Sequence, residues 1–130
     1  MIKQRYDFDE VRKIYQENQK QLDNLVQNIV QLSCENRQTI ATAESCTGGL
    51  LSQKITAVPG ASQMFALGIC TYTNEMKTAI LHVPESTLHT YTAVSPQTAI
   101  AMANGVAALS HADLALSVTG YAGPGGGTSE

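Results

Sequence analysis

The fold is decided by the stretch ATAESCTGGLL, residues 41–51. A short β-prone run, residues 39–43, stops at a polar turn that ends in two glycines, and an apolar helical pattern follows. This order predicts a strand, a loop and a helix, with Ser45 at the bend. A hydroxyl there lies beside the free backbone N–H groups of a helix start, which suit an anion or a developing oxyanion. Ser is also a preferred helix N-cap, so an ordinary cap is the alternative interpretation.

The composition is that of one globular domain. The chain has 130 residues, 43% of them hydrophobic, and a formal net charge of −3. Lys and Arg are thinly spread and none follows Lys77, so nucleic acid is not favoured as a partner. The three cysteines have no metal-ligand spacing, which favours reduced thiols in a cytoplasm. We find neither a signal core nor a run of about 20 apolar residues, and we expect a soluble, cytoplasmic protein without a membrane partner.

The pattern along the chain predicts strands that alternate with helices. The first strand covers residues 39–43, the second lies within residues 64–73, and the third covers residues 113–119. The second run is apolar enough to be buried on both faces. Helices are predicted after Gly49 and from positions 74, 84 and 96. This alternation predicts an α/β fold with a mostly parallel sheet.

Before the first strand, apolar residues at helical spacing predict a helix from Leu22 to about Asn36. Residues 1–21 are charged and polar with few apolar anchors, and we expect an N-terminal helical extension with a possible hinge near residues 18–21. Residues 22–130 are then the α/β domain.

In a parallel sheet the carboxyl ends of the strands share one edge, where ligands bind. The three predicted strand exits read Glu44-Ser45, Tyr72-Thr73-Asn74 and Thr119-Gly120. We therefore expect these polar groups to gather at one edge of the sheet.

Lys77 falls in the first turn of a helix for which Asn74 is the expected cap. The helix dipole disfavours a cation there, and a partly desolvated lysine with a lowered pKa can act as a base. A serine within its reach becomes a useful nucleophile, so Ser45 and Lys77 are a candidate pair. Tyr72 could donate a hydrogen bond or relay a proton, and Thr119 could position the substrate or the lysine. A solvated surface lysine and a half-buried strand tyrosine remain the alternatives.

Glycines cluster in the loop that begins at Gly120 and includes Gly123. Consecutive N–H groups in such turns, together with those of Gly48 and Gly49, could hold a phosphate or carboxylate. The spacing matches neither the P-loop nor the dinucleotide fingerprint, and a flexible loop is the alternative for residues 125–127. The histidines lack a third ligand, so no metal is expected.

Five blocks of sequence, in order and spacing, resemble the CinA C-terminal domain family. The resemblance covers about residues 22–127, and its blocks are AESCTGG (43–49), PGAS (59–62), YTNEMK (72–77), AVS (93–95) and VTGYAGP (118–124). It implies a three-layer α/β/α fold with a mixed sheet. The family's enzymes deamidate nicotinamide mononucleotide to nicotinate mononucleotide and ammonia, without a metal or organic cofactor.

Carried over by residue, the resemblance implies Ser45 as nucleophile, Lys77 as its base and Tyr72 assisting them. It adds further pocket candidates, which together with the glycines make up the substrate-binding set Glu44, Thr47, Gly48, Gly49, Thr119, Gly120 and Gly123.

Family members usually continue with at least one more strand and a closing helix, so we expect the third strand to be an open edge or to be covered by another subunit. A homo-oligomer is therefore expected. A non-catalytic nucleotide-binding or protein-interaction domain is the main alternative to the amidohydrolase, and a serine hydrolase acting on another amide is a third hypothesis.

Overall fold

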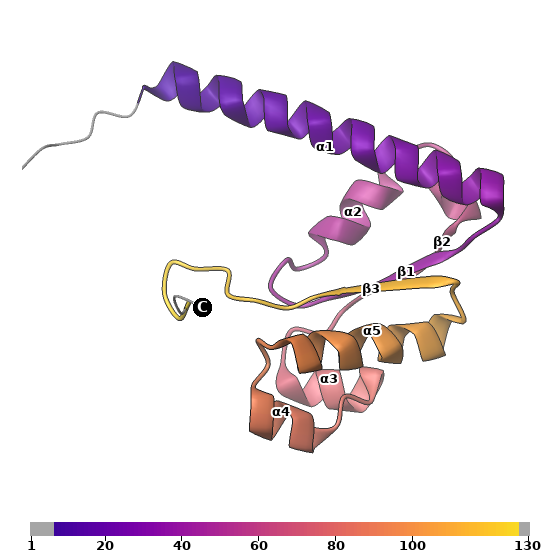
Figure 1. The fold of residues 1–130 in the computed structure, drawn as a ribbon, viewed down its shortest axis with the longest axis vertical. Helices are drawn as coiled ribbons and strands as arrows, with labels where there is room; N and C mark the ends of the chain where they lie inside the picture. Colours follow the sequence, from indigo (N-terminus) through magenta and orange to yellow (C-terminus); the bar gives the residue numbers. More distant parts are fainter. Residues whose placement is uncertain (1–6, 128–130) are drawn as a thin grey trace, which may run out of the picture.

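A three-stranded parallel sheet separates two layers of helices in the computed structural model, which describes residues 7–127 (Figure 1). The strands are β1 (Ile40–Glu44), β2 (Phe65–Cys70) and β3 (Leu114–Val118), and their order is β2-β1-β3 with both pairings parallel. On one face lie α1 (Phe8–Asn36) and α2 (Leu50–Thr56); on the other lie α3 (Asn74–Leu81), α4 (Glu85–Tyr91) and α5 (Pro96–Ser110). A short 3₁₀ turn, η1 (Ala61–Gln63), precedes β2. The predicted three-layer α/β/α architecture is confirmed, and the described sheet is wholly parallel.

The central strand β1 is buried along its whole length and separates two cores. One core lies between the sheet and the α1–α2 layer and contains Val26, Val30, Ile40, Ile55, Ala61 and Met64. The other lies beneath α3 and α5 and contains Ala41, Ala43, Leu81, Val83, Met102 and Val106. Because side chains alternate along a strand, the small residues Ala41 and Ala43 face α5 and let that helix approach closely.

The prediction that the second strand is buried on both faces is wrong. Residues of β2 alternate between half-buried and exposed, because β2 is an outer strand of the described sheet. β3 is the other outer strand of the described sheet, and its Leu114 and Leu116 are each 46% exposed. An apolar run reveals that a segment is strand-like, but the number of layers that cover it depends on its place in the sheet.

Helix ends follow local side-chain chemistry. Ser95 caps α5 by accepting the N–H of Thr98, with Pro96 at the first helical position, as predicted. The expected cap of α3 is off by one residue, because the Thr73 hydroxyl accepts the N–H of Met76 and Asn74 is already helical. The possible hinge near residues 18–21 is also wrong, since α1 continues unbroken from Phe8 to Asn36.

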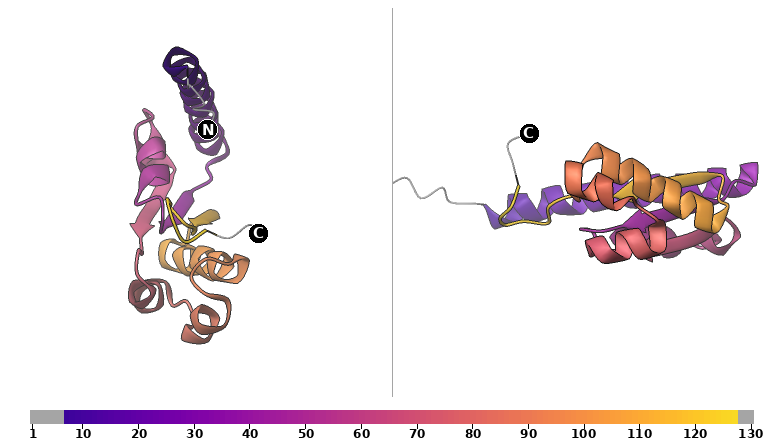
Figure 2. Two further views of the ribbon diagram at one scale, coloured as in Figure 1. Left: turned by 90° about the vertical axis from the view of Figure 1, so that its left-hand side faces the viewer. Right: turned by 90° about the horizontal axis from the view of Figure 1, so that it is seen from below.

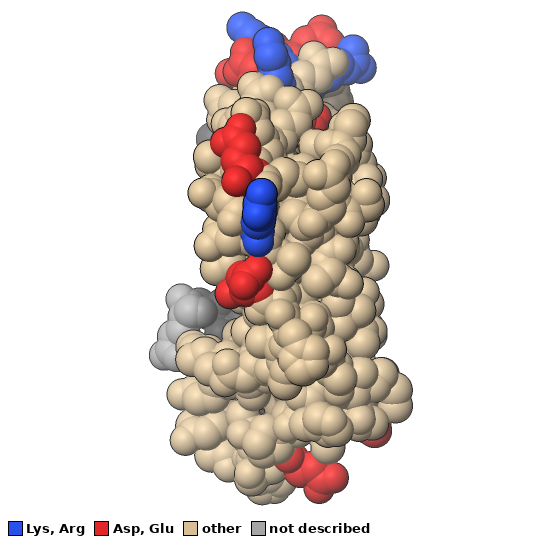
Figure 3. All heavy atoms as spheres, turned by 90° about the vertical axis from the view of Figure 1, so that its right-hand side faces the viewer, with Lys and Arg blue, Asp and Glu red and all other residues tan. Residues whose placement is uncertain are grey.

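Charged groups are sparse on the side of the molecule shown in Figure 3. There, Lys and Arg alternate with Asp and Glu, and most of the visible surface is uncharged. That face offers no basic tract of the kind that binds nucleic acid. Of the helices described, none combines the length and apolarity that crossing a membrane would demand.

Candidate active site

Ser45 and Lys77 meet at the carboxyl end of the sheet. Ser45 follows β1 directly, Lys77 belongs to α3, and the Lys77 Nζ lies 2.9 Å from the Ser45 Oγ. Both residues are buried, with 7% of Ser45 and 1% of Lys77 exposed. The pair that the sequence suggested is therefore within hydrogen-bond distance.

Backbone hydrogen bonds between strand exits bring the two residues together. The Ser45 N–H donates to the carbonyl of Val118 at the end of β3, and the Thr71 N–H donates to the carbonyl of Glu44 at the end of β1. The chain then turns at Thr73 into α3, whose first turn carries Lys77 back beneath the loop. Because the strands are parallel and in register, the residues that follow their carboxyl ends lie side by side, as the strand pattern predicted.

The buried Lys77 amine is surrounded by oxygen atoms of the protein. Its Nζ donates to the carbonyls of Thr71 at 2.8 Å and Tyr72 at 3.2 Å, and no carboxylate forms an ion pair with it among residues 7–127. Burial lowers the pKa of Lys77 below 10.5, and the opposing influence of the nearby Cys70 and Cys46 thiols does not offset it. A neutral amine has two N–H groups for the two carbonyls and one lone pair for the Ser45 hydroxyl. The arrangement therefore suits a base.

Glu44, expected as a substrate-binding residue, is fully buried and engaged elsewhere. Its carboxylate accepts the N–H groups of Leu51 and Ser52 and the hydroxyls of Thr47 and Ser52. Burial alone would raise the pKa of Glu44, but these hydrogen bonds outweigh burial and lower it. Glu44 thus caps the N-terminus of α2 from the end of β1 and fixes the loop that carries Ser45.

The two glycines of this loop allow the backbone to turn from β1 into α2. Gly48 and Gly49 have positive φ values of 61° and 103°, a backbone region open to glycine without steric cost. The Gly48 N–H donates to the carbonyl of Ser45, so it is not free for a ligand. Glu44, Thr47, Gly48 and Gly49 support the site from behind and do not line its cavity.

A cavity of 300 Å³ opens above the Ser45–Lys77 pair. Its lining includes the predicted residues Ser45, Tyr72, Lys77, Thr119, Gly120 and Gly123. Tyr72 is 67% exposed, and its contact with Lys77 is made by the backbone carbonyl. The Thr119 hydroxyl donates to the carbonyl of Ala93, which ties the exit of β3 to the loop before α5. The volume is at the lower end of the range for small-molecule sites, about 300–1,000 Å³.

Among the described residues, no group of His, Cys, Asp or Glu side chains is arranged to hold a metal ion. The ends of the three strands thus present a serine, a buried amine and a glycine-rich loop around one hollow.

A family model described as the CinA C-terminal domain matches residues 22–130. The chain belongs to the CinA C-terminal domain family.

Relatives of this CinA domain carry matching names. The chain is 50% identical over 117 residues to a "Putative competence-damage inducible protein" of Caldanaerobacter subterraneus subsp. tengcongensis, covering 90% of the chain and 28% of that protein. It is 54% identical over 102 residues to a "CinA-like protein" of Desulfovibrio desulfuricans, covering 78% of the chain and 24% of that protein. The chain spans about a quarter of the length of these curated relatives.

Solved structures of the CinA superfamily share the fold. The competence/damage inducible protein CihA of Agrobacterium tumefaciens matches with a TM-score of 0.80 at 42% identity, over 83% of this chain and 66% of that one. A CinA superfamily protein of Escherichia coli matches with a TM-score of 0.79 at 36% identity, over 82% of this chain and 62% of that one.

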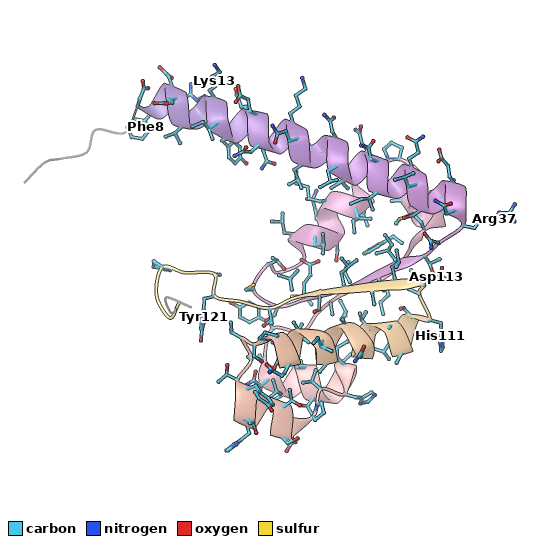
Figure 4. All side chains as sticks on the ribbon, in the orientation of Figure 1. Phe8, Lys13, Arg37, His111, Asp113 and Tyr121 are labelled. Atoms are coloured by element: carbon cyan, nitrogen blue, oxygen red, sulfur yellow. The ribbon has the colours of Figure 1, made fainter. Side chains whose placement is uncertain are left out.

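Several lining residues of this CinA domain escaped the sequence analysis. Cys46, Val94 and Tyr121 line the cavity, and the Thr71 carbonyl holds the amine. Tyr121 lies in the loop beyond β3 (Figure 4). Cys46 follows the predicted residue Ser45 and Tyr121 follows the predicted residue Gly120, so their positions in the sequence could have identified them as lining residues. A backbone carbonyl such as that of Thr71 leaves no signal, because every residue has one.

Proposed function

We propose that this CinA domain is an amidohydrolase that deamidates nicotinamide mononucleotide through Ser45 and Lys77. The observation that carries the proposal is the buried 2.9 Å contact between the Ser45 hydroxyl and an amine of lowered pKa at the base of a cavity. A serine becomes nucleophilic when a base of this kind can take its proton. The substrate itself comes from the resemblance to the family's enzymes.

In the proposed reaction, the Ser45 Oγ attacks the carboxamide carbon while Lys77 takes the hydroxyl proton. The tetrahedral intermediate collapses, Lys77 returns the proton to the departing nitrogen, and ammonia leaves an acyl ester on Ser45. Water then attacks the ester, with Lys77 again as base, and releases the carboxylic acid.

Backbone N–H groups would stabilise the oxyanion of each intermediate. The Ser45 and Gly48 amides are bonded to the Val118 and Ser45 carbonyls. Of the loop amides within the described chain, those of Cys46, Thr47 and Gly49 have no hydrogen-bond partner. Because Cys46 lines the cavity and the other two residues do not, we assign the oxyanion to the Cys46 amide.

The remaining groups of the cavity would hold the nucleotide. Gly120 and Gly123 line the hollow, and the glycine-rich loop that contains them offers backbone N–H groups to the 5′-phosphate. Tyr72 lies at the rim and is two-thirds exposed, so that it could contact the nicotinamide ring or the leaving group.

Ammonia release from nicotinamide mononucleotide by the purified chain tests the proposal. Ser45→Ala and Lys77→Met should each abolish release, because one removes the nucleophile and the other the base. The matched controls Ser62→Ala and Lys20→Met alter exposed positions outside the cavity and should keep the wild-type rate. Release retained by Ser45→Ala would refute the covalent mechanism.

A second candidate is a non-catalytic nucleotide-binding module. The observation that favours it is the exposure of the loop around Gly123 and Gly125, which leaves one side of the cavity without a buried wall. Binding of nicotinamide mononucleotide by calorimetry without ammonia release would support this module. Turnover of other amides but not of this one would instead indicate a different serine amidase.

A further inference from the structure

The loop that joins α4 to α5, residues 92–95, has a strained backbone at Thr92. The φ of 65° and ψ of 174° at Thr92 fall in a region that glycine adopts and that a β-branched residue avoids. Arg37, His82 and His111 also have positive φ, but their ψ values of 26° to 37° belong to the ordinary left-handed conformation that ends a helix. Strain of the kind found at Thr92 persists only where the surrounding contacts enforce it.

Two hydroxyl groups at the start of α5 hold the Thr92 backbone in place. The Thr98 hydroxyl donates to the Thr92 carbonyl at 2.6 Å, and the Ser95 hydroxyl donates to the same oxygen at 3.2 Å. Thr98 lies in the first turn of α5 and is fully buried. The Thr92 carbonyl is therefore fixed to the N-terminus of α5, and the rest of the 92–95 loop begins from a fixed point.

A third hydroxyl fixes the next residue of the loop to the sheet. The Thr119 hydroxyl donates to the Ala93 carbonyl at 2.7 Å. Thr119 follows Val118, whose carbonyl accepts the N–H of Ser45. The 92–95 loop is therefore attached both to α5 and to the strand exit beside the candidate nucleophile.

The residues held in this way line the cavity. Ala93 and Val94 are half-buried and border the same hollow as Ser45 and Lys77. The loop belongs to the layer of α3, α4 and α5, which lies on the face of the sheet opposite α1 (Figures 1 and 2). Because Lys77 comes from α3, the loop and the candidate base lie on the same side of the sheet.

We propose that the 92–95 loop is a preorganised wall of the cavity, that Thr98 is a positioning residue that holds it from outside, and that Val94 selects a flat apolar ring next to the amide. This role rests on the proposed amidohydrolase function. Among the lining residues of the described chain, Val94 is the only aliphatic one larger than alanine. A ring whose carboxamide reaches Ser45 lies against Val94, because the loop is attached to the strand exit beside Ser45.

The strain at Thr92 fits a preorganised wall. A loop without fixed contacts adopts several conformations, and a ligand that needs one of them loses affinity in selecting it. The hydrogen bonds from Thr98 and Thr119 involve only groups of the protein, so they form on folding. Folding therefore offsets the strain, and Val94 is in place before the ligand binds.

Steady-state kinetics of ammonia release from nicotinamide mononucleotide test the wall. Val94→Ala should raise KM about tenfold and keep kcat within about twofold, because an apolar contact made equally in the ground and transition states affects binding alone. Thr98→Val should also raise KM, although Thr98 does not line the cavity, and Thr98→Ser should restore it because serine keeps the hydroxyl. The matched control Thr90→Val alters an exposed position of α4 outside the cavity and should keep both constants.

Methyl relaxation measured by NMR tests the wall without relying on turnover. The Val94 methyl groups should be ordered in the wild type and in Thr98→Ser, and more mobile in Thr98→Val. The methyl groups of Val58, which packs in the core on the other face of the sheet, should not change. If the wild type releases no ammonia, the amidohydrolase assignment fails, and this comparison still decides whether Thr98 holds the loop.

Thermal unfolding tests the strain at an exposed position, where substitution leaves the core intact even if Thr98→Val fails to fold. Thr92→Gly should unfold at a higher temperature than Thr92→Ala, because glycine adopts this φ and ψ without strain. At an ordinary loop position the order is the reverse, since alanine restricts the unfolded chain more than glycine does.

Equal order of the Val94 methyl groups in the wild type and Thr98→Val would overturn the proposal, because the Thr98 hydroxyl would then not hold the loop. An unchanged KM in Val94→Ala would remove the selecting contact. A fall in kcat at constant KM in Thr98→Val would mean that Thr98 acts on the Ser45–Lys77 pair instead, and a Thr92→Ala variant more stable than Thr92→Gly would show that Thr92 is not strained.

Discussion

At the scale of single residues, the site depends on two buried ionisable groups, Glu44 and Lys77, whose surroundings favour opposite outcomes. The surroundings of Glu44 stabilise its charged form, and those of Lys77 favour its neutral form. Glu44 stays charged because four hydrogen bonds from N–H and O–H donors replace its water. Lys77 has carbonyl and hydroxyl oxygen atoms around its amine, and burial lowers its pKa. One group consequently supports the loop, and the other is available as a base.

The lowered pKa of Lys77 makes stability depend on pH in the alkaline range. The unfolded chain keeps the proton up to pH 10.5, whereas the folded chain releases it at a lower pH. Between these two pKa values the unfolded state binds more protons, so this group makes the free energy of unfolding rise with pH. Urea unfolding at several pH values should show that slope in wild type and in Lys20→Met, and a smaller slope in Lys77→Met. An unchanged slope in Lys77→Met would argue against the lowered pKa.

Replacing Glu44 should weaken the whole fold. In Glu44→Gln, the side-chain NH₂ group faces N–H and O–H donors that the carboxylate oxygen now accepts, so some of these donors lose their hydrogen bonds. We expect a loss of about 2–4 kcal/mol in the free energy of unfolding. Because folding lowers the pKa of Glu44, the stability it contributes is present above pH 4.5 and is lost as the pH falls through the folded pKa.

Denaturant unfolding at neutral and acidic pH measures both effects. The control Glu17→Gln changes an exposed helical carboxyl and should alter stability by less than about 0.5 kcal/mol. If Glu44→Gln is as stable as that control, Glu44 does not hold the α2 N-terminus as described.

At the scale of elements, α5 approaches the end of α3 closely at Gly105. A Cβ added at Gly105 of α5 would collide with the backbone carbonyl of Leu81, which closes α3 just ahead of Val83. Because the obstacle is backbone and not a flexible side chain, a rotamer change gives no relief. The glycine is therefore required by packing, although it lies inside a helix that would favour alanine.

Gly105→Ala should destabilise the protein by about 2 kcal/mol or more, because overpacking outweighs the gain in helix propensity. Thermal unfolding of this variant beside Asn104→Ala gives the comparison. Asn104 is the exposed neighbour in α5, and alanine there should leave stability unchanged or slightly higher. A stabilised Gly105→Ala would mean that α3 and α5 lie further apart than described.

At the scale of the whole molecule, β1 is the only described strand with a neighbour on both sides. Its five residues are buried, while the outer strands β2 and β3 each expose residues along one face. Both cores meet at β1, so the hydrogen bonds of this strand cannot break without disrupting the two helical layers. Local unfolding should therefore begin outside β1.

Native-state hydrogen exchange should follow this arrangement. Amides of β1 between Ala41 and Ala43 should exchange only by global unfolding, with the free energy that denaturant unfolding gives. Amides on the free edges of β2 and β3 should exchange faster by local opening. Equal protection of β3 and β1 would indicate that the β3 edge is covered in solution.

Much of the fold could be predicted because its signals are local. The predicted strands overlap the observed ones with ends that differ by a few residues, and the caps at Ser95 and near Asn74 follow from short-range hydrogen bonding. The burial of β2 could not be predicted, because its apolar run does not reveal that it is an outer strand. The structural role of Glu44 was missed because the family resemblance gave it as a pocket candidate, whereas the direction in which its carboxylate points depends on how α2 packs against the end of β1.

The sequence by itself determined the alternation of strands and helices, the polar strand exits and the membership of Ser45 and Lys77 in one candidate pair, because these follow from periodicity, turn residues and parallel topology. Only the tertiary structure decided that the amine is buried among the Thr71 and Tyr72 carbonyls and that Glu44 faces α2 instead of the cavity. It also decided that α1 packs on the sheet layer through Val26 and Val30. The physical reason is that burial and backbone hydrogen bonding depend on which elements pack together, and residues far apart in the chain supply those neighbours.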